Sequence, residues 1–143
     1  MEATELSTGD EASVVSLWEE VGLTRPWNDA SADFHRALTG PSSTILGLND
    51  DGELIGTVMV GSDGHRGWVY YLAVRESRRG QGHGRMLMAA AEEWLREHGA
   101  VKVQLMVRNE NEPVLEFYAA AGYERSDVQV LSRWIRDPQL DCR

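Results

Sequence analysis

Apolar residues recur at helical spacing in four stretches of the chain. The first follows the capping-box spacing of residues 8–11, repeats at i, i+3, i+4 and i+7, and stops at Gly22. A glycine also follows the third and the fourth stretch, as expected where a helix ends. The pattern therefore predicts four helices, at residues 8–21, 30–38, 82–98 and 112–121.

Alternating or β-branched apolar stretches lie between and after these helices. Two of them flank Asp51-Gly52, a strong hairpin turn signal, so we expect them to be antiparallel neighbours. A third is rich in aromatic and β-branched residues, and the last two alternate apolar with polar positions. The pattern predicts strands at residues 43–48, 54–61, 68–74, 101–107 and 128–135.

The order of these elements predicts a mixed sheet. The strand at residues 68–74, the helix at 82–98 and the strand at 101–107 form a βαβ unit, whose strands pair in parallel through a right-handed crossover. The hairpin adds antiparallel strands, so the expected fold class is α/β with a mixed, α+β type sheet. A chain of 143 residues, 42% of them hydrophobic, fits one domain over residues 1–143.

The net charge and the cysteine content exclude several classes of function and of site. Fourteen Lys and Arg against 23 Asp and Glu give a net charge of -9, which argues against binding to nucleic acid or to an anionic membrane. A single cysteine, Cys142, excludes an intrachain disulfide framework and a cysteine-based zinc site, and the histidines lack ligand spacing for any metal. Because no signal peptide or long apolar run occurs, we expect a soluble, cytoplasmic protein.

The segment from Val74 to Arg85 leaves a strand and enters a helix. Glycines at three alternate positions, 80, 82 and 84, let the backbone approach a ligand, and the helix start favours a phosphate or pyrophosphate. Four arginines against Glu76 make this segment locally basic, although a glycine-rich turn with solvated arginines would look the same. The Walker motif and the dinucleotide fingerprint are both absent.

Two motifs resemble those of a known family. Residues 79–84, Arg-Gly-Gln-Gly-His-Gly, resemble the Arg/Gln-x-x-Gly-x-Gly/Ala signature of the GNAT superfamily of N-acetyltransferases. Residues 111–118, followed by Gly122-Tyr123, resemble its second motif of Asn, Tyr seven residues later, and Gly-aromatic. Residues 25–28, 63–67 and 70–72 are further similar to the small bacterial YpeA-type acetyltransferases. The resemblance implies a GNAT-like fold with about six to seven strands and four helices, and acetyl-CoA as cosubstrate.

The resemblance also implies roles for individual residues. The main chain of Leu72, Ala73 and Val74 would pair with the pantetheine arm, as an added strand would. Asn111 would bond the pantetheine, and Tyr118 would face the sulfur as general acid. The pyrophosphate would be held by the N–H groups of the loop, from Arg79, Gly80, Gln81, Gly82, His83, Gly84 and Arg85.

The residues themselves allow two interpretations of Tyr118. A phenol with a pKa of about 10 stays protonated at neutral pH and can protonate a departing thiolate whose thiol has a pKa near 8.5. The helix face that carries Tyr118 also belongs to the core, so a packed tyrosine with a satisfied hydroxyl is the alternative.

The base that would deprotonate an amine acceptor is less defined. Many relatives keep a carboxylate on the strand before the loop, and residues 68–74 have none. This leaves deprotonation to a water chain, to Tyr70 or Tyr71, or to a group from elsewhere such as Asp63 or His65. Trp27, on a connector between helices, either closes the edge of the core or forms a pocket wall. The candidate acceptor-binding residues are Trp27, Asn28, His65, Tyr70 and Tyr71.

These observations predict an N-acetyltransferase that moves acetyl from acetyl-CoA directly to a primary amine and releases CoA. The acceptor could be a protein N-terminus, a lysine, a polyamine or another small amine. The alternative is a non-catalytic acyl-CoA-binding sensor module that acts through a protein partner. The strand at residues 128–135 either completes the sheet or supports the edge of a homodimer.

Overall fold

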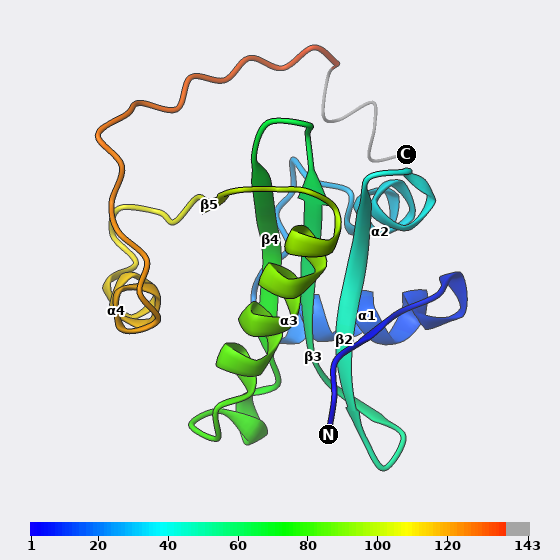
Figure 1. The fold of residues 1–143 in the computed structure, drawn as a ribbon. Helices are drawn as coiled ribbons and strands as arrows, with labels where there is room; N and C mark the ends of the chain where they lie inside the picture. The colour runs from blue at the N-terminus through cyan, green and yellow to red at the C-terminus, as the bar shows by residue number, and fades with distance from the viewer. Residues whose placement is uncertain (137–143) are drawn as a thin grey trace.

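The computed structural model describes residues 1–136, and Cys142 lies outside them. Five strands form one sheet in the order β1-β2-β3-β4-β5, antiparallel except for the parallel pair β4–β5 (Figure 1). The strands are β1 (Thr4–Glu5), β2 (Ser43–Asp50), β3 (Glu53–Ser62), β4 (Gly67–Val74) and β5 (Val103–Leu105). The α-helices are α1 (Glu11–Glu20), α2 (Ala30–Thr39), α3 (His83–Glu97) and α4 (Glu112–Ala120), with 3-10 turns at Thr8–Asp10 and Glu76–Arg78.

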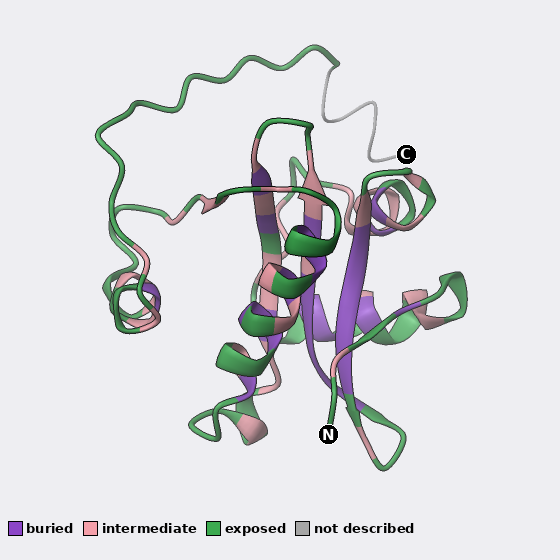
Figure 2. Ribbon diagram, in the orientation of Figure 1, coloured by how far each residue is buried: buried purple, intermediate pink, exposed green. Residues whose placement is uncertain are grey.

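Helices cover both faces of the sheet. On one face, α1 and α2 bury Trp18 and Phe34 against the sheet, and on the other α3 buries Leu87 and Leu95 (Figure 1). Central strands β2 and β3 are therefore buried along most of their length (Figure 2). The four helices, the hairpin and the βαβ unit expected from the sequence are confirmed.

The first helix begins slightly later than expected. The capping box joins Ser7 to Asp10, whose carboxylate accepts from the Ser7 N–H at 2.9 Å, rather than residues 8 and 11. Residues 8–10 form a 3-10 turn, and α1 starts only at Glu11. At the hairpin, Asp51 and Gly52 both have positive φ, as the primed turn between β2 and β3 requires.

A β-bulge interrupts β4 at Tyr71, which has φ +52°. Before it, Val69 faces the α3 side. After it, Leu72 and Val74 pack on that side, whereas Ala73 faces α1 and α2. A tyrosine in the left-handed region is uncommon, and surrounding contacts hold it there. Trp18 stacks on its ring at 3.9 Å, and the Thr57 hydroxyl donates to its carbonyl oxygen while accepting from the Trp18 indole.

The expected strand at residues 128–135 is wrong. This segment has no regular structure, and its apolar side chains are exposed, with Ile135 at 93% (Figures 1 and 2). Alternation alone does not make a strand, because the backbone needs a neighbour to pair with. For a similar reason β5 is shorter than residues 101–107. It pairs only with the first three residues of β4, and the described sheet has five strands instead of six to seven.

No helix within residues 1–136 is long and apolar enough to cross a membrane. The same residues contain no group of three His, Cys, Asp or Glu side chains that could hold a metal ion. The homodimer stays a prediction.

Candidate active site

Strands β4 and β5 run side by side for only a short distance. Gly67–Val69 pairs with Val103–Leu105, and from Tyr70 onwards this edge of β4 has no strand partner in the described sheet. Leu72, Ala73 and Val74 lie in this open part of the strand, and Ala73 and Val74 pair with β3 on the opposite side. An extended ligand that carries amide groups could pair with the open edge.

A loop that contains the 3-10 turn Glu76–Arg78 connects the open edge of β4 to the start of α3. Gly82 is the N-cap, with φ +83°, and no side chain caps the helix. The N–H groups of the first turn, His83, Gly84 and Arg85, have no intrahelical acceptor by helix geometry. This turn contains Arg85 and no acidic residue. An anion would therefore meet both N–H donors and the positive end of the helix dipole.

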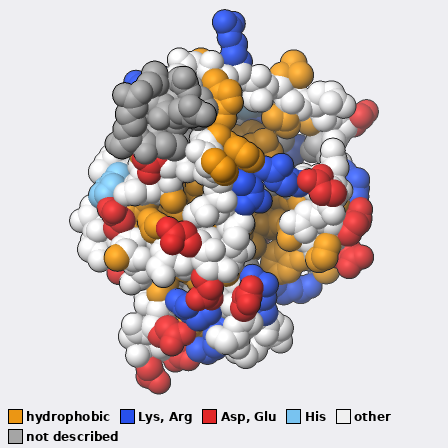
Figure 3. Space-filling model, turned by 180° about the vertical axis from the view of Figure 1, so that it is seen from behind, with side chains coloured by type: hydrophobic (Ala, Val, Ile, Leu, Met, Phe, Trp, Pro, Cys, Tyr) orange, Lys and Arg blue, Asp and Glu red, His pale blue; other side chains and the backbone are white. Residues whose placement is uncertain are grey.

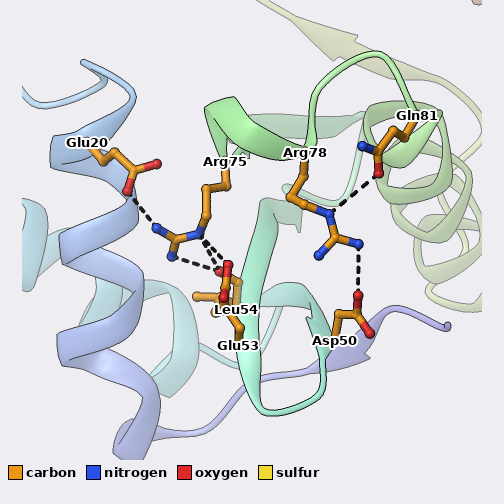
Figure 4. Close-up of polar contacts among 7 residues, drawn as sticks. All are labelled: Glu20, Asp50, Glu53, Leu54, Arg75, Arg78 and Gln81. Carbon is orange, nitrogen blue, oxygen red and sulfur yellow. Dashed lines mark hydrogen bonds and ion pairs between the residues drawn. The ribbon is translucent and has the colours of Figure 1, made fainter.

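Two of the four loop arginines are committed elsewhere (Figure 4). Arg75 binds Glu20 of α1 at 2.5 Å and Glu53 at 3.3 Å, and it also donates to the Leu54 carbonyl. Arg78 binds Asp50 at 2.8 Å, and its Nε also lies 3.5 Å from the Gln81 side-chain oxygen. The basic character inferred from the sequence is thus partly neutralised by acids on α1, β2 and β3.

Arg79, Arg85 and His83 differ in what they offer a ligand. Arg79 donates from Nε to the Val74 carbonyl at 3.2 Å, and Arg85 donates to the Ala120 carbonyl at 3.3 Å, and both are exposed. Neither has a carboxylate partner among residues 1–136, so both charges are available to an anion. The His83 ring is buried against the Arg78 carbonyl, which leaves its backbone N–H as its contribution.

The first turn of α3 also meets α4. A Cβ at Gly84 would lie 3.1 Å from the Phe117 ring, so glycine at this position allows the two helices to approach closely. Farther along, the Tyr123 hydroxyl donates to Glu92 of α3 at 2.6 Å. These contacts fix α4 beside the glycine-rich loop.

Tyr118 of α4 is 8% exposed and packs edge-on against Phe117 and Tyr123. Within the described residues its hydroxyl has no hydrogen-bond partner, so the satisfied hydroxyl of the alternative interpretation is not found. Burial raises the pKa of Tyr118 to about 12, which keeps the phenol protonated at neutral pH. Asn111 is the exposed N-cap of α4, and its side chain makes no capping bond, so its amide is free for a ligand.

A pocket of about 580 Å³ lies on the α2 side of β4. Among the residues that line it are Asn28, Asp33, Arg36, Met59, Tyr70 and Tyr71. The face of the molecule on which α1 lies is hollowed, with hydrophobic side chains in the hollow and charges of both signs around it (Figure 3). The structure thus brings together three of the five expected acceptor residues.

Trp27 and His65 do not line this pocket in the described structure. Trp27 is 43% exposed, so it does not close the core. His65 lies in the exposed turn between β3 and β4, where its N–H and that of Arg66 both donate to Asp63. These bonds lower the pKa of Asp63, which also accepts from the Trp68 indole. Asp63 therefore acts as a turn cap.

Asp33 was missed in the sequence. Its carboxylate accepts from the Tyr71 hydroxyl at 2.7 Å and from Arg36 at 2.7 Å. Burial, and then this bond to Asp33, raise the pKa of Tyr71 above its ordinary value. The only signal in the sequence was an Asp-x-x-Arg spacing in the predicted second helix, which is common on solvated helix faces.

The buried phenols predict a loss of stability in alkali. Tyr118 ionises near pH 12 when folded and near pH 10 when unfolded, so its contribution is full below pH 10 and is lost as pH rises to 12. This amounts to on the order of 2–3 kcal/mol. Urea unfolding at pH 9 and pH 11.5 measures the loss. Tyr118→Phe should show a smaller drop, and an equal drop in both proteins would contradict the assignment.

Comparison with known proteins gives a consistent result. Residues 13–123 match the model of the acetyltransferase (GNAT) family. A structure of AAC(6')-Iy with the bisubstrate analogue CoA-S-monomethyl-acetylneamine has a TM-score of 0.81 at 17% identity, over 93% of this chain and 97% of that one. A ribosomal-protein-alanine N-acetyltransferase from Brucella melitensis biovar Abortus has a TM-score of 0.73 at 19% identity, over 94% of this chain and 100% of that one. A transcriptional regulator from Bacillus halodurans has a TM-score of 0.75 at 21% identity, over 92% of this chain and 98% of that one.

Proposed function

Because the chain belongs to the GNAT acetyltransferase family, we propose that it transfers the acetyl group of acetyl-CoA directly to a primary amine. The observation that carries this proposal is the open edge of β4, which is followed by the glycine-rich loop and the uncapped start of α3. A long ligand with amides at one end and a pyrophosphate at the other matches this sequence of donors and acceptors. Two similar structures are described as bound to a CoA analogue and as an alanine N-acetyltransferase, which supports the proposal.

In the proposed complex, the main chain of Leu72, Ala73 and Val74 pairs with the pantetheine arm. The N–H groups from Arg79 to Arg85 hold the pyrophosphate, and the exposed Arg79 and Arg85 add positive charge. Asn111 bonds the pantetheine through its free amide. The bound cosubstrate supplies an activated acetyl thioester at the sulfur end.

The transfer needs no covalent enzyme intermediate. The amine nitrogen attacks the thioester carbonyl carbon, the C–N bond forms, and the C–S bond breaks as the tetrahedral intermediate collapses. Tyr118 gives its proton to the departing sulfur, since its phenol is protonated and free of other partners in the described structure. The products are an acetamide and CoA with a free thiol.

The test is an assay of thiol release from acetyl-CoA in the presence of a panel of primary amines, with acetyl-CoA binding measured separately by calorimetry. We expect binding in the micromolar range and thiol release that depends on both protein and amine. Binding without release would favour the non-catalytic acyl-CoA sensor. No binding of acetyl-CoA would overturn both functions.

A further inference from the structure

The pocket beside α2 lies next to the proposed acetyl-CoA edge of β4. Tyr70 and Tyr71 form part of its wall, and the next three residues of the same strand form the open edge. The bulge at Tyr71 turns its side chain to the α1 and α2 face, whereas Leu72 packs on the α3 side. A small molecule in this pocket would therefore lie across the strand from the proposed thioester site.

We propose that this pocket binds the acceptor, and that Asp33 receives its ammonium group and takes a proton from it before the nitrogen attacks the thioester. The acceptor class is a primary amine on an apolar carbon frame with no carboxylate beside the amine. The inference rests on the proposed function and supplies the base that residues 68–74 lack.

Asp33 is the carboxylate that the structure leaves available. Asp29 caps α2 through the N–H of Ala32 at 3.0 Å, and Asp63 caps the turn before β4. Neither is among the described residues that line the pocket, whereas Asp33 is. The Asp33 side chain is 25% exposed, so a ligand can reach it while part of its hydration is already removed.

Two neighbouring side chains orient the Asp33 carboxylate and leave it able to accept further hydrogen bonds. Tyr71 holds Oδ2, and Arg36, whose side chain is 64% exposed, holds Oδ1. Each carboxylate oxygen can accept a further hydrogen bond. An ion pair with a largely solvent-exposed arginine such as Arg36 is weak, so an incoming ammonium competes with it at small cost.

The surroundings favour a cation over a zwitterion. Around Tyr71 the negative charges of Asp33 and Asp29 face one positive charge, that of Arg36. A carboxylate on the carbon next to the amine would add a like charge to this region. The remaining surface includes apolar side chains of Leu23, Ala37 and Met59, which suit a hydrocarbon frame.

The protons balance in the overall step. One proton passes from the ammonium to Asp33 before the attack, which frees the nitrogen lone pair, and then passes from Asp33 to solvent. The second N–H proton, lost when the amide forms, balances the proton that Tyr118 gives to sulfur. The net reaction converts an ammonium ion and acetyl-CoA into an acetamide, CoA and one released proton.

Asp33→Asn tests the assignment, because it keeps the shape and an oxygen acceptor for Tyr71 but removes the charge and the base. Asp51→Asn, in the hairpin turn between β2 and β3, is the matched control. The measured quantities are kcat/KM for 2-phenylethylamine by thiol release, acetyl-CoA binding by calorimetry, and thermal melting. We expect Asp33→Asn to lower kcat/KM about 100-fold, with acetyl-CoA affinity within about twofold of the unchanged protein. Asp51→Asn should leave both unchanged.

The unchanged protein tests the acceptor class even if Asp33→Asn fails to fold. It should acetylate 2-phenylethylamine, or a peptide that begins with phenylalanine, at least about 10-fold faster in kcat/KM than free phenylalanine. The ratio of kcat/KM for 2-phenylethylamine to kcat/KM for the peptide shows whether the acceptor is a small amine or the N-terminus of a chain. Equal use of phenylalanine would overturn the acceptor class, and a folded, fully active Asp33→Asn would overturn the role of Asp33. If none of the amines in the panel supports thiol release, that result would instead contradict the proposed function itself.

Discussion

Replacing Tyr118 by Phe should lower kcat about 100-fold or more while leaving acetyl-CoA binding unchanged. A general acid contributes roughly 10²–10⁴-fold, and this phenol has no competing hydrogen bond within the described structure. The ring stays in place, so the edge-on contacts with Phe117 and Tyr123 persist. Because the loss falls on the step that releases sulfur, kcat should fall while the calorimetric Kd for acetyl-CoA stays within about twofold.

Tyr123→Phe is the matched control for this substitution. Its hydroxyl donates to Glu92 of α3 and helps to fix α4, and the proposed mechanism gives it no role. We expect it to lower the melting temperature slightly and to retain most of the turnover. Full activity in Tyr118→Phe would remove Tyr118 from the mechanism, and an equal fall in both variants would indicate a structural effect.

The second large effect is expected at Gly82. A Cβ at this position meets no atom within 4 Å, so the indole of Gly82→Trp would project into the open space over the first turn of α3. This is the space in which we place the pyrophosphate. We expect acetyl-CoA affinity to fall at least about 100-fold, because the indole fills the volume over the N–H donors and covers them.

Backbone strain must be separated from blockage of the site. A side chain at φ +83° costs about 1–2 kcal/mol whatever the space around it. Gly99, at the far end of α3, has φ +84° and also meets nothing within 4 Å, so Gly99→Trp carries the same strain away from the loop. Calorimetry should show normal acetyl-CoA binding by Gly99→Trp. Normal binding by Gly82→Trp would place the pyrophosphate elsewhere.

The elements that are defined by local patterns could be predicted from the sequence. The amphipathic face of α3, the Asp51-Gly52 turn and the crossover from β4 to β5 each depend on residues close together in the chain. The glycine-rich loop was also predictable, because its glycines and the start of α3 are adjacent.

Features that depend on distant partners could not be predicted. The sequence leaves Arg75 and Arg78 available for a phosphate. In the structure they form ion pairs with Glu20 and Asp50, which are distant from them in the chain. Asp33 reaches Tyr71 of β4 only because α2 packs on the neighbouring strands β2 and β3, and no residue near it in the sequence indicates Tyr71 as its partner. The segment at residues 128–135 shows the reverse case, a strand-like pattern with no edge to join.

The bulge at Tyr71 makes the length of β4 matter more than its composition. Odd-numbered Val69 and even-numbered Leu72 and Val74 face the same helix because one extra residue lies between them. An insertion or deletion of one residue after position 71 would reverse the faces of the sheet on which the following side chains lie. Side chains that meet α3 would then meet α1, and the reverse. Libraries that diversify residues 67–74 should therefore keep the residue count fixed, whichever side chains they sample.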